Sequence, residues 1–203
     1  MGKAMVLVII CFLLSIPSVS FCQTSLNPHS WSGNVNLLLG AKFLDDDDWE
    51  PVDEQVEGGI LVDFKQNRFP LSIAIDLLYS GDDQDIGVTV FGFGTFGAHV
   101  EARTTEVNIG VRKIWEKFET VRPFIGGGMA IINAELESKT LGASESDDDT
   151  GLGVWIDAGI YLTLSQRFNL GVDARWSRAE VDLFGVTGQA GGWHIGAMAG
   201  FHW

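Results

Sequence analysis

The sequence predicts an all-β protein, an eight-stranded antiparallel up-and-down transmembrane β-barrel, and three observations lead to this fold class. Apolar residues recur at every second position over eight separate stretches, which is the period of a strand with two unlike faces. One face of these stretches is apolar and almost uncharged, with aromatic residues near its ends, whereas the other face is small or polar. The connections alternate between short and long, as in a meander of neighbouring strands.

The alternation places the strands in order along the chain, and the last one is the most regular. From Trp193 to Trp203 every second residue is apolar, while the residues between them are histidine, glycine and methionine. The expected strands are residues 34–43, 59–64, 71–80, 106–115, 122–137, 151–164, 167–177 and 193–203. An even number of strands allows the first and last to pair antiparallel and close the barrel.

The fifth stretch, RPFIGGGMAIINAELE, alternates less clearly than the others. We assign its faces so that Asn133 and Glu135 lie on the polar side. On this interpretation the apolar side carries Phe124, Ala130, Ile132, Ala134 and Leu136.

The connections divide by length into two sets. The short ones are residues 65–70, 116–123 and 165–167, and the long ones are residues 45–57, 81–100, 137–151 and 184–192. In an up-and-down meander all long loops then lie at one end of the barrel. The short turns and both chain termini lie at the other end.

The composition of the two faces indicates that the apolar face points outward into a membrane. The polar face holds mainly glycine, asparagine, serine and alanine with few lysines, which suits a packed interior better than a water-exposed wall. The apolar face ends in two aromatic rims, the girdles of a membrane barrel. One rim collects Phe64, Trp115, Phe124, Phe168, Phe201 and Trp203, and the opposite rim collects Phe43, Tyr79, Trp176 and Trp193.

The first residues of the chain predict a secretory signal peptide over residues 1–22, with the barrel domain at residues 23–203. Lys3 precedes an apolar run over residues 4–16 that is too short to span a bilayer comfortably. An N-terminal anchor is the alternative. Lipid attachment at Cys22 is a further one, although Phe21 stands where that modification needs a small residue.

Overall charge excludes one class of partner. The 203 residues carry a net charge of −14 and a sequence pI of about 4.5, so the chain lacks the basic surface that nucleic acid binding requires. More than half of the 27 acidic residues lie in three runs, DDDDWEPVDEQVE, GDDQD and ESDDD, all in the expected long loops. These runs predict solvated loops, with weak divalent cation binding as the alternative.

Two segments resemble the small bacterial outer-membrane β-barrels. The final GAMAGFHW is similar to their closing strand, with Trp203 in place of the commoner phenylalanine, and RPFIGGGMAI resembles a strand of the OmpA-, OmpX- and OmpW-like barrels. The resemblance covers about residues 31–203. It implies the outer membrane of a Gram-negative bacterium, periplasmic termini, contact with outer-membrane lipid and lipopolysaccharide, and a barrel-assembly machinery that reads the last strand.

Charged residues on the polar face are expected to fill the lumen, because an eight-stranded barrel is only wide enough for side chains. These residues are Lys42, Asp63, Asp76, Glu106, Arg112, Glu135, Asp157, Asp173 and Arg175. If Leu164 faces Phe168 across the short turn at 165–167, then Asp157 lies directly opposite Arg175. The sequence therefore predicts a paired, plugging network, and an aqueous or ligand conduit is the alternative.

Function follows from these expectations only in outline. The sequence favours a structural or surface-interaction role without catalysis, cofactor or metal site. His194 faces inward near the rim of long loops, but the sequence shows no serine and acid spaced to serve it as a hydrolase would need. Two alternatives remain: a conduit or binder for small hydrophobic molecules that uses Phe91, Phe93 and Phe96, and a lipid-modifying enzyme.

Overall fold

The computed structural model describes residues 31–203 except 67, 91–93, 117–119, 141–142 and 165–166, so the predicted signal peptide lies outside the described residues. The described chain contains one short helix and nine strands. Their bounds are β1 Trp31–Phe43, α2 Asp46–Trp49, β2 Glu54–Gln66, β3 Ser72–Val90, β4 Gly94–Ile114, β5 Val121–Thr140, β6 Ala143–Leu164, β7 Phe168–Leu183, β8 Val186–Gln189 and β9 Gly192–His202.

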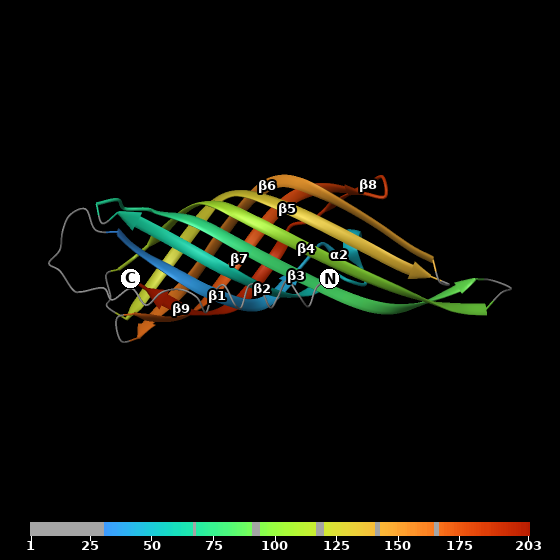
Figure 1. Ribbon diagram of the computed structural model, residues 1–203, viewed down its shortest axis with the longest axis horizontal. Coiled ribbons are helices and arrows are strands. Elements are labelled where there is room, and N and C mark those ends of the chain that lie inside the picture. The colour runs from blue at the N-terminus through green and yellow to red at the C-terminus, as the bar shows by residue number, and fades with distance from the viewer. Residues whose placement is uncertain (1–30, 67, 91–93, 117–119, 141–142, 165–166) are drawn as a thin grey trace.

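Eight of the strands close into an antiparallel barrel, which confirms the predicted fold class. Strands β1 to β7 follow one another around the wall, and β9 fits between β7 and β1 (Figure 1). The short β8 pairs with β7 alone among the described strands. Every pairing is antiparallel, and the pairings form a closed ring. Because no edge of the described wall is left open, its backbone satisfies its own hydrogen bonds, as a sheet in hydrocarbon must.

Helices contribute little to the described part of the chain. None of its helices has the length and apolar character needed to cross a bilayer.

One strand register and the pairing of the last strand with the first, both predicted from the sequence, are confirmed. Leu164 faces Phe168 in the β6–β7 pair, and Asp157 therefore lies opposite Arg175. The last strand pairs with the first along the closing seam, where Trp203 and Gly33 exchange backbone hydrogen bonds of 3.0 and 3.1 Å.

The long loops expected at 81–100 and 137–151 are wrong, because these residues extend the strands. β3 and β4 pair from Ser72–Arg112 to Val90–Gly94, and β5 and β6 pair from Val121–Leu162 to Thr140–Ala143. Alternation signals a strand only where one face is buried, and beyond the membrane both faces of these hairpins meet water. We call this end of the barrel the hairpin end and the opposite end, with the short connections, the turn end (Figure 1).

The other long connections also contain structure. Residues 45–57 include α2 and the start of β2, and residues 184–192 include β8. Leu44, Trp49 and Val52 are buried against the apolar end of the lumen, and the Trp49 indole donates a 2.6 Å hydrogen bond to the Gln189 carbonyl. This acidic connection therefore folds over the mouth of the barrel and covers it.

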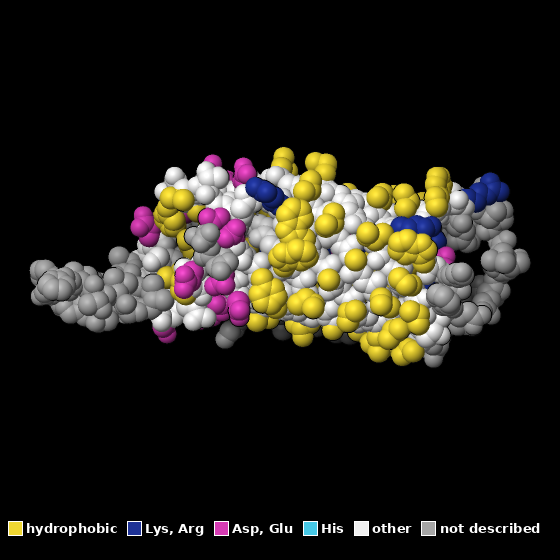
Figure 2. Space-filling view, turned by 180° about the vertical axis from the view of Figure 1, so that it is seen from behind, with side chains coloured by type: hydrophobic (Ala, Val, Ile, Leu, Met, Phe, Trp, Pro, Cys, Tyr) yellow, Lys and Arg dark blue, Asp and Glu magenta, His cyan; other side chains and the backbone are white. Residues whose placement is uncertain are grey.

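The outer wall carries an apolar band, with acidic side chains gathered at the hairpin end (Figure 2). Of the ten predicted girdle residues, nine lie on the outer wall, at least partly exposed: Phe43, Phe64, Tyr79, Trp115, Phe168, Trp176, Trp193, Phe201 and Trp203. Phe124 is the exception, because its ring is buried in the lumen.

The predicted faces of the fifth strand are thus exchanged in the structure. Ala130, Ile132 and Ala134 are buried with Phe124, whereas Ile125 and Met129 point outward. The assignment rests on Asn133 and Glu135, which lie on the outer face near the hairpin end, where Asn133 contacts Thr150 and Glu135 contacts Arg103. Glu135 therefore belongs to the outer surface of a hairpin and not to the lumen network.

Candidate functional site

The inside of the barrel holds the largest set of buried charged groups in the described chain. The structure places eight of the nine predicted lumen residues there, all but Glu135, each at most 3% exposed: Lys42, Asp63, Asp76, Glu106, Arg112, Asp157, Asp173 and Arg175. Burying so many charges is costly unless they pair, so their contacts decide what the lumen can do.

Arg112 on β4 is the centre of the first cluster. Its Nη2 lies 2.8 Å from Oδ2 of Asp76 and 2.5 Å from Oδ2 of Asp157, and its Nη1 lies 3.6 Å from Oδ2 of Asp63. These carboxylates come from β3, β6 and β2 respectively. One guanidinium thus links three strands across the lumen, a role for which its fork of donors is well shaped.

Arg175 on β7 completes this cluster from the other side. Its ion pair with the directly opposite Asp157 is present at 3.5 Å, but the shorter contact, 2.6 Å, goes to Asp76. Asp173 adds a third carboxylate at 3.7 Å from Nε. Strand register therefore predicts the neighbour correctly, whereas the strongest partner lies across the lumen, where pairwise register gives no information.

Aromatic rings cover the flat faces of the two guanidinium groups. The Arg112 guanidinium carbon lies 5.2 Å from the centre of the Phe124 ring and 5.8 Å from that of Trp155, and Arg175 lies 5.0 Å from Trp155. Phe124 stacks on Tyr161 with 4.5 Å between ring centres. Two rings for Arg112 and one ring for Arg175, together with the carboxylates, enclose each cation in protein.

A second cluster lies closer to the hairpin end. Lys42 lies 3.5 Å from Glu106, and His194 contacts Oε2 of Glu57 through Nδ1 at 2.5 Å. The Ser177 hydroxyl lies 3.1 Å from both Nε2 of His194 and Oε2 of Glu106. The expectation that no serine and acid could serve His194 is therefore wrong.

Sequence reasoning missed two of these partners for an identifiable reason. Glu57 falls at the end of an expected loop, although β2 begins at Glu54 and carries it into the lumen. Ser177 pairs with Gly192, diagonally beside His194 on the next strand, and the turn-based registers do not extend to the β7–β9 pair. The β7–β9 register, which the long connection at 184–192 leaves open in the sequence, is the signal that would have found this neighbour.

A third polar group fills the turn end of the lumen, and the sequence analysis missed it as well. Arg122 donates hydrogen bonds of 2.9 Å to the side-chain oxygens of Asn34 and Asn169, and Asn34 in turn donates to Asp63 at 2.6 Å. Arg122 falls in the expected short connection at 116–123, but β5 begins at Val121 and turns it inward.

Two ligand sites are expected outside the lumen: the aromatic run with Phe91, Phe93 and Phe96, and the acidic loops. Phe91 and Phe93 lie outside the described residues, and Phe96 is described in its backbone alone, which pairs with Val88 in the β3–β4 hairpin. In the described part of the chain, no group of three or more His, Cys, Asp or Glu side chains is arranged to hold a metal ion. Weak cation binding by the acidic runs stays a prediction.

Comparison with known proteins supports the fold. No protein-family model matches the sequence, and no curated protein sequence matches it. Among solved structures, a major outer membrane protein from Thermus thermophilus is similar with a TM-score of 0.60 and 11% identity, over 86% of this chain and 100% of that one. OprG from Pseudomonas aeruginosa is similar with a TM-score of 0.52 and 9% identity, over 85% and 95%.

A third similar structure is Ail, the attachment invasion locus protein of Yersinia pestis, in complex with the heparin analogue sucrose octasulfate. Its TM-score is 0.58 with 12% identity, over 86% of this chain and 99% of that one. At such identities the likeness shows architecture alone. The chain thus has the fold of the small bacterial outer-membrane β-barrels, built around a charged and aromatic lumen.

Proposed function

We propose that the chain is a non-conducting, non-catalytic outer-membrane barrel that displays its long hairpins to interact with other surfaces. The observation that carries this proposal is the filling of the lumen. Arg112 and Arg175 are each enclosed by carboxylates and aromatic rings, and Trp49 covers the mouth at the hairpin end. Such an interior supports a rigid wall and leaves the exposed hairpins to provide function.

The orientation in the membrane is part of this proposal. The hairpin end faces the outside of the cell and the turn end, with the termini, faces the periplasm, because single-chain bacterial barrels carry short periplasmic turns and longer outer loops. An epitope inserted after Gly185, in the turn between β7 and β8, tests it. Antibody binding to intact cells is the expected result, and binding only after lysis would reverse the orientation.

The charge of the hairpin end favours basic partners. Asp82, Asp83 and Asp85 lie close together on β3, and Asp147 to Asp149 follow one another on β6. The similar Ail structure holds a sulfated heparin analogue, but the acidic hairpins of this chain would repel such a polyanion. We propose instead a positively charged protein surface as the partner.

The absence of catalysis rests on the surroundings of Ser177. Although Ser177, His194 and Glu57 form the hydrogen-bonded order of a hydrolase triad, Ser177 is 1% exposed. Its hydroxyl also lies beside the Glu106 carboxylate, whose charge opposes the oxyanion that acyl transfer must stabilise. A fluorophosphonate probe should leave Ser177 unlabelled, and stoichiometric labelling would make the chain an enzyme.

Bilayer conductance tests whether the lumen is plugged. The refolded barrel in a planar lipid bilayer should show no steps above the baseline. The variant Arg112→Ala/Arg175→Ala removes two of the largest buried side chains of the plug and should conduct, provided its gel mobility shows that it folds. Regular channel openings by the unaltered chain would exclude a plugged barrel and favour the conduit.

A further inference from the structure

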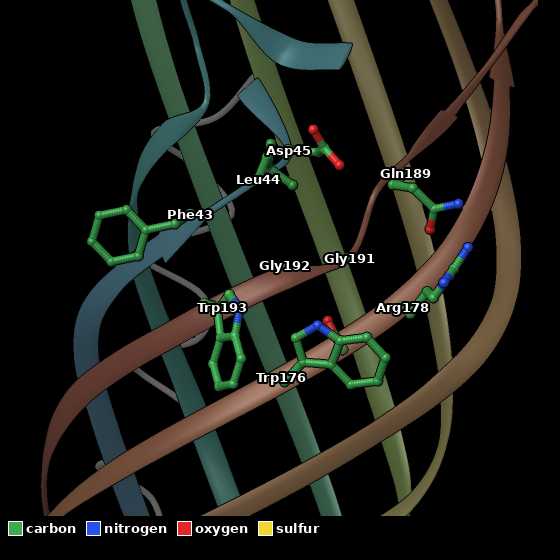
Figure 3. A pocket seen from close by; sticks show the side chains of 10 residues that line it. Phe43, Leu44, Asp45, Trp176, Arg178, Gln189, Gly191, Gly192 and Trp193 are labelled. Carbon is green, nitrogen blue, oxygen red and sulfur yellow. The ribbon is translucent and has the colours of Figure 1, made fainter. Parts of the chain in front are cut away.

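A cavity of about 410 Å³ lies at the hairpin end of the outer wall, where β1, β7 and β9 meet (Figure 3). It opens where β1 leaves the barrel after Phe43 while β9 begins at Gly192. Volumes of this size are typical of small-ligand sites. Ser177, whose hydroxyl contacts His194 and Glu106 in the second lumen cluster, also lines this cavity.

Three aromatic residues form a row along one side of the cavity. Strand register places Trp193 beside Phe43 on β1 and beside Trp176 on β7, and all three point away from the lumen. Figure 3 shows the two indole rings next to each other below the backbone of Gly192. The row belongs to one of the aromatic girdles, which lie at the level of lipid headgroups. The cavity, just beyond the row, therefore lies at headgroup depth.

The opposite side of the cavity carries polar groups held in place. The Gln189 backbone is fixed by Asp48, which accepts its N–H at 2.9 Å, and by Trp49, which donates to its carbonyl. Its side-chain Nε2 donates to Glu180 at 3.3 Å, while its buried Oε1 has no hydrogen-bond partner within the described chain. A buried acceptor without a hydrogen-bond partner favours a ligand that brings a hydroxyl or N–H donor.

Charge on the cavity rim defines the ligand further. The Arg178 guanidinium is well exposed and held only loosely by Glu180, at 3.8 Å. A guanidinium suits a phosphate, whose oxygens accept two parallel hydrogen bonds.

We propose that this cavity binds the phosphorylated sugar headgroup of a glycolipid in the surrounding leaflet. The sugar ring lies on the indole faces, its hydroxyl donates to Gln189, and its phosphate meets Arg178. The acyl chains continue along the apolar wall below Trp176 and Trp193. The site rests on the proposed membrane placement, but it does not depend on whether the lumen conducts or on which partner the hairpins bind.

Native mass spectrometry of the folded chain in detergent tests this site. The probe is an equimolar mixture of monophosphoryl lipid A and phosphatidylglycerol, which each carry one phosphate and acyl chains but differ in the sugar. One lipid A molecule should remain bound in preference to phosphatidylglycerol. Arg178→Gln and Gln189→Met should each reduce that preference about tenfold, and Arg103→Gln, an arginine on the distant β4 wall, should leave it unchanged.

Several outcomes would overturn the site. Equal retention of phosphatidylglycerol would reduce it to nonselective anion attraction, and unchanged selectivity in Arg178→Gln and Gln189→Met would move lipid A binding elsewhere. Displacement of lipid A by soluble glucosamine phosphate would assign the cavity to a free sugar. Each variant is first checked for the mobility shift of a folded barrel, so loss of binding is separated from loss of folding. A channel found in the conductance experiment would leave these results unaffected.

Discussion

At the scale of single residues, parity along a strand predicts most of the lumen correctly. Asp76, Asp157 and Arg175 are assigned to the inside because the opposite face of their strands is continuously apolar. The same reasoning fails for Phe124, since the run from Gly126 to Gly128 has no side chains to mark a face. Contacts across the lumen, such as Arg175 to Asp76, are not predictable because they depend on barrel closure and not on neighbouring strands.

The position of Phe124 leads to a stability prediction. Phe124→Ala should lower the free energy of unfolding by about 3–5 kcal/mol, because it leaves a cavity beside Tyr161 and uncovers the Arg112 guanidinium. Ile125→Ala is the matched control: Ile125 is 52% exposed on the outer wall, where lipid chains can fill the space. Urea unfolding from phospholipid vesicles measures the free energy of unfolding of both variants. An equal or larger loss for Ile125→Ala would indicate that Phe124 lies in the outer girdle and not in the lumen.

The arginine cluster leads to a second prediction. Arg175→Met should lower the free energy of unfolding by roughly 3–5 kcal/mol, because it leaves buried carboxylates with too little positive charge. Arg175→Met/Asp76→Leu should cost less than the single change, since it removes a charge of each sign. Arg178→Met, three residues along β7 and exposed, should change stability little. A double variant less stable than the single one would contradict this account of the plug.

At the scale of whole elements, the hairpins differ most from the sequence-based expectation. Strands β3 to β6 pair beyond the region where β2 and β7 accompany them, so a four-stranded sheet continues past the barrel wall. Its residues alternate weakly because water receives both faces, and the pattern therefore predicts loops. Backbone pairing, which carries no sequence signature of its own, extends the strands.

The edge of β6 gives the element-scale prediction. Beyond Gly153, β6 no longer pairs with β7, but the Asp149 and Asp147 carboxylates accept the backbone N–H groups of Asp182 and Phe184 at 2.7 and 2.6 Å. Asp147→Ala/Asp149→Ala should therefore speed amide hydrogen exchange in the β7–β8 hairpin, because alanine offers no side-chain acceptor. Asp148→Asn removes a charge from the same run and should leave that exchange unchanged. Equal effects of both changes would assign the protection to charge alone.

The same contact sets a pH dependence. Two backbone hydrogen bonds hold the pKa of Asp149 below its ordinary value. The one from Asp182 contributes most, and the one from Thr150 contributes less. The contact is thus fully present above the ordinary range of an aspartate and is lost only as pH falls through the lower pKa of the folded state. A carbon NMR titration of the Asp149 carboxyl should show this depressed midpoint. A midpoint at or above that of a free aspartate would show that the contact does not form in solution.

At the scale of the whole molecule, closure is the property that the sequence predicts best. Eight apolar faces in an even meander require the first and last strands to pair, and β1 and β9 do so. The register of this seam is beyond prediction, because the strands lie far apart in sequence and no short turn connects them. Glycines mark it in the structure, where the two backbones approach closely.

Gly40 tests the importance of this seam. A Cβ atom there would collide with the Ile195 carbonyl on β9, whereas a Cβ on Gly58 of β2 would meet its nearest heavy atom at 3.9 Å. Gly40→Ala should therefore hinder closure and reduce the fraction of chain that migrates as a compact band on unheated gels, while Gly58→Ala folds normally. A closed barrel shields all its backbone groups, so chains with an open seam should also insert poorly into vesicles. Equal folding of both variants would show that the seam has more freedom than the β1–β9 register allows.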